Sequence, residues 1–174
     1  RCADLLTALW RHSVLAGFFA KEIARARRRN VDVAFLCGLL HDVGKAVLLN
    51  NVDRGVAAGE LAIDAAELRD ALHEHHVAAG TVLALRWKLP EPIGEAMRCH
   101  HEPSRATKFQ ALSLTVAFAD VLAHHVAPNV FAEPLDEEQL RRHPTLAGLN
   151  LYPDQVGELL GLRAKALAVA EGMR

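Results

Sequence analysis

Apolar side chains recur every three or four residues along most of this chain, which is the spacing of an amphipathic helix. Over residues 4–28 the apolar side of a predicted first helix carries Leu5, Leu9, His12, Ala16, Phe19 and Ile23. Asp32 is the predicted N-cap of a second helix that continues to Leu40. Gly44 is expected to interrupt or end this helix, and residues 45–49 to add a short apolar turn.

The next part of the chain is more polar. Residues 50–60 carry two glycines among polar residues and are predicted to form a loop. Asp64 is expected to cap a short helix that reaches about Leu72. The helical pattern restarts near residue 75 or 76 and runs to Lys88.

The last third of the chain predicts further helices separated by prolines. One should begin at Pro92, where proline suits a first helical turn, and reach His101. A long apolar helix is predicted over residues 108–126, a loop over residues 128–144, and a final amphipathic helix over residues 154–173. Because no useful stretch alternates apolar and polar residues, we expect an all-α bundle of about six or seven helices.

Composition is consistent with a packed helical domain. Apolar residues make up 51% of the 174 residues, charged residues 24% and aromatic residues only 5%, a balance that favours helices rich in Ala and Leu over sheets. This length suffices for one domain with a substantial core, so residues 1–174 are predicted to form a single domain. The chain starts at Arg1 rather than Met, and we expect a fragment of a longer protein.

Charge and cysteine content narrow the possible partners and compartment. The formal net charge is −1, so no global positive field attracts nucleic acid, and no nucleic-acid partner is expected. The basic run at residues 25–29 is interpreted as a helix end, with a phosphate-binding patch as the alternative. Three cysteines without C-x-x-C spacing indicate reduced thiols and a cytoplasmic location. No segment approaches the roughly 18 uninterrupted apolar residues of a membrane span, so no membrane association is expected.

Histidine is unusually frequent, at 10 residues, and several histidines lie beside carboxylates or in pairs. The pair His41-Asp42 directly follows an apolar helix, where a carboxylate suffers a desolvation penalty unless a cation or donors meet it. Asp120 lies inside the most apolar predicted helix. Neutral imidazoles combined with carboxylates are typical ligands of divalent metals.

Taken one at a time, these histidines and carboxylates also have simpler interpretations than metal binding. His12, on the apolar side of the first helix, could be a hydrogen-bonded core histidine. Asp120 could pair with an arginine, and the pair His100-His101 could be a solvated helix end. Together, however, these residues form a pattern that the separate explanations do not predict.

The order of these residues resembles the H…HD…D signature of the HD superfamily of metal-dependent phosphohydrolases. Four longer motifs resemble its HDOD branch, a bacterial signalling module related to the HD-GYP cyclic-dinucleotide phosphodiesterases. They are LWRHS at residues 9–13, GLLHDVGK at residues 38–45, WKLPEPI at residues 87–93 and HHEP at residues 100–103. The resemblance spans residues 9–122, and residues 154–173 resemble the closing helix of the family. It implies a helical HD-domain bundle.

The resemblance also implies a pair of divalent metal ions. The first would be held by His12, His41, Asp42 and Asp120. Asp42 would bridge to a second ion held by His76, His100 and His101. His76 fits the H-x-x-x-G step of the two-metal branches, with His73 and His75 as competitors. Three imidazoles at the second position favour iron, manganese or zinc over magnesium.

Residues beside these ligands have less definite expected roles. Lys45 resembles the lysine of the HD-x-G-K motif, where it would contact a substrate phosphate; the alternative is a solvent-facing lysine. His124 and His125 are interpreted as surface histidines, although His124 could instead orient Asp120 from one helical turn away. His143 lies in a predicted loop.

Two departures from the family patterns matter. Residues 102–106 read EPSRA where the HD-GYP branch has a glycine-tyrosine-proline segment, so cyclic di-GMP is not assumed as the substrate. HDOD proteins usually carry a helical portion before the segment with which this chain starts.

We therefore expect a metal-dependent phosphohydrolase, similar to a phosphodiesterase, that acts in bacterial signal transduction. Its substrate would be a phosphate-containing small molecule or nucleotide, its catalytic residues Asp42 and Lys45, and its further partners other signalling domains. One alternative is a non-catalytic HDOD signalling scaffold whose metal site is structural. An iron oxygenase built on the same scaffold is a third hypothesis.

Overall fold

Helices make up the regular structure of this chain in a computed structural model that describes residues 2–173. In chain order they are α1 (Cys2–Ala26), α2 (Val31–Leu40), α3 (Val43–Ala57), α4 (Ala65–Arg86), α5 (Glu91–Cys99), the 3-10 helix η1 (Pro103–Arg105), α6 (Gln110–Val126), α7 (Glu137–Arg141), α8 (Thr145–Leu149), α9 (Pro153–Gly161) and α10 (Arg163–Gly172). Across residues 2–173 there is an isolated β-bridge between Asn129 and Ala132 but no strand. The all-α prediction is confirmed.

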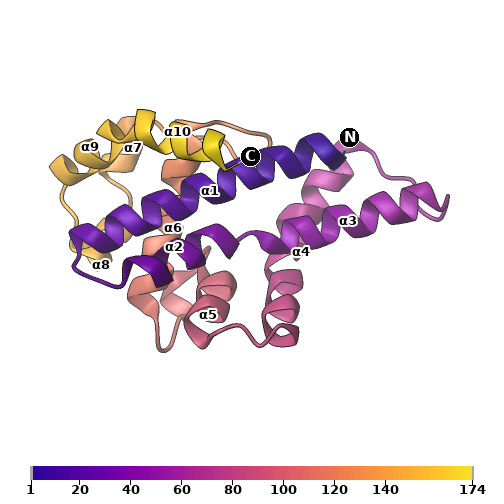
Figure 1. The fold of residues 1–174 in the computed structure, drawn as a ribbon, viewed down its shortest axis with the longest axis horizontal. Coiled ribbons are helices and arrows are strands. Elements are labelled where there is room, and N and C mark those ends of the chain that lie inside the picture. The colour runs from indigo at the N-terminus through magenta and orange to yellow at the C-terminus, as the bar shows by residue number, and fades with distance from the viewer. Residues whose placement is uncertain (1, 174) are drawn as a thin grey trace.

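The long helix α1 is the centre of the fold and packs against α2, α6 and α10 (Figure 1). The largest apolar cluster joins these helices and includes Phe19, Ile23, Phe118, Leu122, Val156 and Ala166. Helix α2 approaches α1 closely at Gly38, where an added Cβ atom would lie 2.6 Å from the carbonyl oxygen of Ala16. His12, on the buried side of α1, is thereby held in the interior.

Helices α3 and α4 pack against each other on the side of the molecule away from α7, α8 and α9 (Figure 1). The loop predicted over residues 50–60 is wrong, because α3 continues to Ala57. Apolar residues of α3 pack onto Leu68 and Leu72 of α4, and this burial outweighs the low helix propensity of Gly55. The chain leaves the helix at Gly59, whose φ of 72° is the left-handed conformation that glycine adopts readily.

Helix α4 is continuous where two shorter helices were expected. Asp64 caps it as predicted, by accepting hydrogen bonds from the backbone N–H groups of Ala66 and Glu67. One buried stripe then runs through α4 at four-residue spacing: Leu68, Leu72, His76, Gly80 and Ala84. This unbroken stripe packs as one surface, so the predicted interruption near residue 73 does not occur.

The remaining differences concern helix ends and short helices. Asn30 rather than Asp32 caps α2, because the Asn30 side chain accepts the N–H groups of Asp32 and Val33. The loop predicted over residues 128–144 contains α7, and the predicted final helix is divided into α9 and α10 around Leu162. These short helices raise the number of α-helices in residues 2–173 to ten, above the expected six or seven.

A buried carboxylate fixes the start of α6 relative to α5. Glu95 of α5 accepts hydrogen bonds from the backbone N–H of Thr107 at 3.0 Å, of Lys108 at 3.2 Å and of Phe109, and from the Thr107 hydroxyl at 3.0 Å. Burial raises the pKa of Glu95, but these donors outweigh it and lower the pKa below its usual value. The residues that follow α5 are therefore held at a fixed position beside α6. Within residues 2–173, no helix has both the length and the apolar character required to cross a membrane.

Candidate metal centre

The structure brings all seven predicted metal ligands close together. They come from five parts of the fold: His12 from α1, His41 and Asp42 from the α2–α3 turn, His76 from α4, His100 and His101 from the end of α5, and Asp120 from α6. All but His101 and Asp120 are buried. Their role as ligands stays a prediction, but their convergence allows the geometry of the cluster to be tested against it.

The carboxylate of Asp42 lies between two groups of imidazoles. Its Oδ2 atom is 3.5 Å from Nε2 of His41 and 3.9 Å from Nε2 of His12. Its Oδ1 atom is 3.4 Å from Nε2 of His76 and 3.7 Å from Nε2 of His100. Each oxygen therefore faces a different group, which is the arrangement expected of a carboxylate that bridges two cations.

The first group is completed by Asp120. Its Oδ1 atom lies 3.0 Å from Nε2 of His12 and 3.5 Å from Nε2 of His41. The two imidazole nitrogens are themselves 3.5 Å apart. Each of the two imidazole nitrogens thus lies near a carboxylate oxygen of Asp42 and one of Asp120, and this set of donors suits a divalent transition metal.

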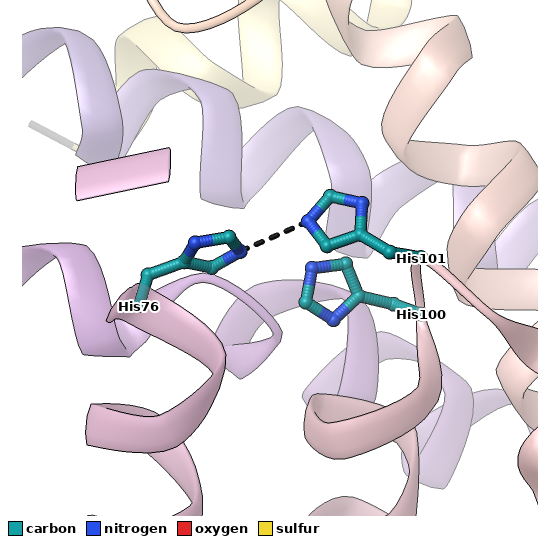
Figure 2. Close-up of side chains that lie close together, drawn as sticks. All are labelled: His76, His100 and His101. Atoms are coloured by element: carbon teal, nitrogen blue, oxygen red, sulfur yellow. Dashed lines mark hydrogen bonds between the residues drawn. The ribbon is translucent and has the colours of Figure 1, made fainter. Parts of the chain in front are cut away.

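The second group consists of histidines from α4 and from the end of α5. Figure 2 shows His100 and His101 projecting toward His76, with the Nε2 atoms of His76 and His101 2.9 Å apart. The competing residues His73 and His75 lie on the same helix as His76, but neither is buried as His76 is. The structure therefore favours His76, as the resemblance to the two-metal branches suggested.

Hydrogen bonds to the backbone set the tautomers of three histidines. Nδ1 of His41 donates to the carbonyl of Gly38 at 2.7 Å, Nδ1 of His76 to that of Leu72 at 2.8 Å, and Nδ1 of His100 to that of Met97 at 2.8 Å. A neutral imidazole that donates from Nδ1 has a lone pair on Nε2. In each case this lone pair faces the cluster, which is the form required of a metal ligand.

Several polar atoms of the cluster are buried without a hydrogen-bond partner. Among them are Asp42 Oδ1, Asp120 Oδ1 and Nε2 of His100. An unsatisfied buried acceptor is costly, and carboxylates that lie beside imidazole lone pairs gain most from a cation. The residues present therefore fit a metal ion.

The charges of the cluster agree with this fit. Burial lowers the pKa of His100 to about 3, so its imidazole is neutral at pH 7. Burial also opposes the charged forms of Asp42 and Asp120. His41 and Lys45 beside Asp42, and the imidazoles of His12 and His41 beside Asp120, outweigh it and keep both carboxyl pKa values below their usual range. Burial likewise opposes protonation of His41, yet Asp42 and Asp120 together raise its pKa.

Lys45 is buried beside the cluster. The alternative prediction, a lysine that faces solvent, is therefore wrong. Its ammonium group forms an ion pair with Oδ2 of Asp42, one helical turn earlier, and lies 5.3 Å from the centre of the Phe131 ring. The contact with Phe131 could not be predicted from the sequence, because the loop after α6 carries this residue from 86 positions further along the chain. The interaction of Lys45 with substrate stays a prediction.

His124 is buried, so its interpretation as a surface histidine is wrong. Its Nε2 atom lies 3.4 Å from Oδ1 of Asp120, and its ring centre is 4.2 Å from that of His12. The alternative, in which His124 orients Asp120 from the next helical turn, agrees with this geometry. His125 instead donates to the carbonyl of Leu135 at 2.8 Å, away from Asp120.

A cavity of about 440 Å³ opens onto one side of the cluster. His100, His101 and Asp120 form part of its wall, and residues of η1, α6, the α7–α8 turn and the start of α8 form the rest. A second cavity, of about 500 Å³, lies near the α1–α2 turn and includes Arg27 and Arg29, but none of the seven predicted ligands lines it. The cluster is thus reachable from one side, a property that a catalytic metal centre requires.

Comparison with known proteins agrees with this architecture. Residues 1–103 match the family model of the HDOD domain. Over 95% of its length the chain resembles a solved HDOD domain protein of unknown function from Geobacter sulfurreducens, with a TM-score of 0.69 and 25% identity, and it covers 62% of that chain.

Two curated relatives are considerably longer than this chain. An uncharacterized protein of Treponema pallidum is 31% identical over 128 residues, which are 65% of this chain and 24% of the relative. A ribonuclease Y of Thermus thermophilus is 30% identical over 141 residues, which are 81% of this chain and 20% of the enzyme. The chain therefore spans about a quarter or less of the curated relatives that it matches here.

Proposed function

The chain belongs to the HDOD domain family, and we propose that it is a metal-dependent phosphohydrolase that cleaves a phosphodiester in bacterial signal transduction. One observation carries this proposal. The two carboxylate oxygens of Asp42 face different groups of imidazoles, and residues of both groups line an open cavity. A site that only braced helices would have no need of this opening.

Each of the two groups would hold one divalent ion. His12, His41, Asp42 and Asp120 would bind the first, and Asp42, His76, His100 and His101 the second. Iron, manganese or zinc suits these nitrogen-rich sets better than magnesium. When bound, such ions supply a water of lowered pKa and positive charge for the phosphoryl oxygens.

The protein's own residues would position the ions and the substrate. The Nδ1–H bonds to Gly38, Leu72 and Met97 keep three imidazole rings in one orientation. Asp42 fixes the spacing between the two groups. The ammonium group of Lys45 forms an ion pair with Asp42. It would leave this carboxylate and bind a substrate phosphate once metal ions balance the charge of Asp42.

A second candidate substrate is RNA. The similarity to ribonuclease Y favours it, because the name of that relative denotes cleavage of RNA phosphodiesters. The low net charge of the chain, −1, favours a small phosphodiester or nucleotide instead. Both substrate classes contain a phosphodiester bond that would be hydrolysed, so parallel assays under the same conditions can show which class the protein cleaves.

The test is hydrolysis by purified protein that has been stripped with a chelator and reloaded with Mn²⁺ or Fe²⁺. We expect turnover of bis(p-nitrophenyl) phosphate that requires the added metal and disappears in His41→Ala. Cyclic dinucleotides and a short single-stranded RNA, assayed in parallel, distinguish the two substrate classes. If metal-replete protein is inert toward all three, the chain is a signalling scaffold with a structural metal site.

A further inference from the structure

His143 lines the same open cavity as three residues of the candidate metal centre. The cavity wall contains His100, His101 and Asp120 of the centre together with His143 of the α7–α8 turn and Thr145, the first residue of α8. His143 is partly buried, and its ring centre is 5.6 Å from that of Phe118 on α6. The imidazole is therefore held by packing at a place that a molecule bound to the metal centre would reach.

Thr145 contacts one of the two ring nitrogens of His143, the Nδ1 atom. The hydroxyl of Thr145 lies 2.8 Å from Nδ1, and the backbone N–H of Thr145 donates to the same atom at 3.5 Å. A backbone N–H can only donate, so this contact favours an Nδ1 atom without a proton and a neutral ring that carries its proton on Nε2. Burial lowers the pKa of His143, which favours this neutral form.

The remaining wall of the cavity is divided between polar and apolar groups. Ser104 adds a second hydroxyl to the wall, whereas Pro103, Leu114 and Val121 provide an apolar surface. A cavity of about 440 Å³ falls in the range of small-molecule sites and suits a ligand of nucleoside size. An alcohol with one apolar face and several hydroxyl oxygens, such as a nucleoside, matches this combination.

We infer that His143 is a substrate-binding residue that donates its Nε2–H to an oxygen of the alcohol part of a nucleoside phosphate. This inference rests on the proposed function, because the phosphate of the ligand would lie at the metal centre. His143 would then recognise the part of the substrate that the metal ligands do not touch. It would contribute to affinity and specificity without transferring a proton.

The inference can be tested by comparing two probes on Mn²⁺-loaded protein by isothermal titration calorimetry. Inorganic phosphate reports on the metal centre alone, and adenosine 5′-monophosphate reports on the centre and the cavity together. In His143→Phe, which keeps an aromatic ring against Phe118, the nucleotide should bind about five- to tenfold more weakly, as expected for one lost hydrogen bond. Phosphate should bind as it does to the unmodified chain.

Two further variants separate recognition from structure. His143→Gln keeps a side-chain N–H donor and should recover most of the nucleotide affinity. His75→Gln changes an exposed histidine and should bind both probes normally. Melting temperatures of all variants check that the fold is retained.

Three results would overturn the inference. Unchanged nucleotide affinity in His143→Phe would remove His143 from the binding site while leaving the proposed function intact. Equal weakening of phosphate and nucleotide would place the effect of His143 at the metal centre rather than on the alcohol. Failure of the unmodified, metal-loaded chain to bind either probe would reject the proposed function together with the inference.

Discussion

The backbone of Gly44 lies directly against that of His76, so that a Cβ atom on Gly44 would be 1.9 Å from the His76 carbonyl oxygen. Gly44 follows the pair His41-Asp42 in α3, whereas His76 belongs to α4. The close approach of these helices is what brings Oδ1 of Asp42 within 3.4 Å of His76. A side chain at Gly44 would therefore separate the two halves of the candidate centre.

Gly44→Ala should destabilise the protein by about 3 kcal/mol or more, because the clash is with backbone that cannot rotate away. The higher helix propensity of alanine, worth about 1 kcal/mol, does not compensate for it. Urea unfolding would measure the difference. Gly161→Ala is the matched control, since no atom lies within 4 Å of the added methyl group; similar losses in both variants would contradict the role given to Gly44.

Asp42→Ala should lose more metal and more stability than Lys45→Ala. Removing Asp42 deletes the carboxylate that both proposed sites share. We expect metal affinity to fall by more than about 100-fold, because loss of a residue that only supports a ligand already lowers affinity by up to about 100-fold. Lys45→Ala should retain its metal and lose activity, because its proposed partner is the substrate. Elemental analysis and melting temperatures compare the variants, and equal metal content would be inconsistent with a bridging Asp42.

His124→Phe should weaken binding of the first metal by about 10- to 100-fold without unfolding the chain. The phenyl ring can fill the buried space beside His12, but it has no N–H group to hold Asp120, 3.4 Å away. Competition with a metal-binding dye measures the affinity. His125→Phe is the neighbouring control, because His125 bonds to Leu135 and not to Asp120. If both variants bind metal equally well, His124 has no part in the centre.

The metal-free protein should become less stable as the pH falls from about 7 to 5. The pKa of His100 is lowered to about 3 and that of His124 to about 4, mainly by burial. The unfolded chain, with histidine pKa values of about 6.5, therefore takes up these protons at a higher pH than the folded chain does. At pH 5 this costs about 2 kcal/mol of stability for each of the two residues.

Other histidines of the cluster modify this pH dependence. The pKa values of His76 and His101 are also lowered, mainly by burial, and add to the loss. The raised pKa of His41 acts in the opposite direction. Its contribution to the free energy of unfolding is complete below about pH 6.5 and disappears as the pH rises through the pKa of the folded state. Urea unfolding of chelator-treated protein at several pH values is the measurement, and a midpoint that rises on acidification would reverse the expected sign.

The helical class could be predicted from the sequence because helix periodicity is a local property. The seven candidate ligands came from the resemblance to the HD superfamily; the fold brings these residues together, and their role as ligands stays a prediction. The sequence was not sufficient to predict α3, since the glycines at 55 and 59 resemble a loop until the packing of α3 on Leu72 is known. The same limit applied to His124, whose burial depends on the ring of His12 from another helix. His143 does lie between helices, as predicted, but nothing near it in the chain indicates that its ring packs near Phe118 and lines the same cavity as residues of the candidate centre.

The candidate centre takes its last ligand from far along the chain. Six of the seven residues lie between His12 and His101, and all six fall within the part that matches the family model, residues 1–103. Asp120 belongs to α6, which also covers Phe19 and Ile23 of α1. During synthesis on the ribosome, a nascent chain that ends before α6 would therefore present an incomplete ligand set and an uncovered apolar face. Loading of the first proposed metal site, which includes Asp120, and closure of the core would become possible together, once α6 has emerged.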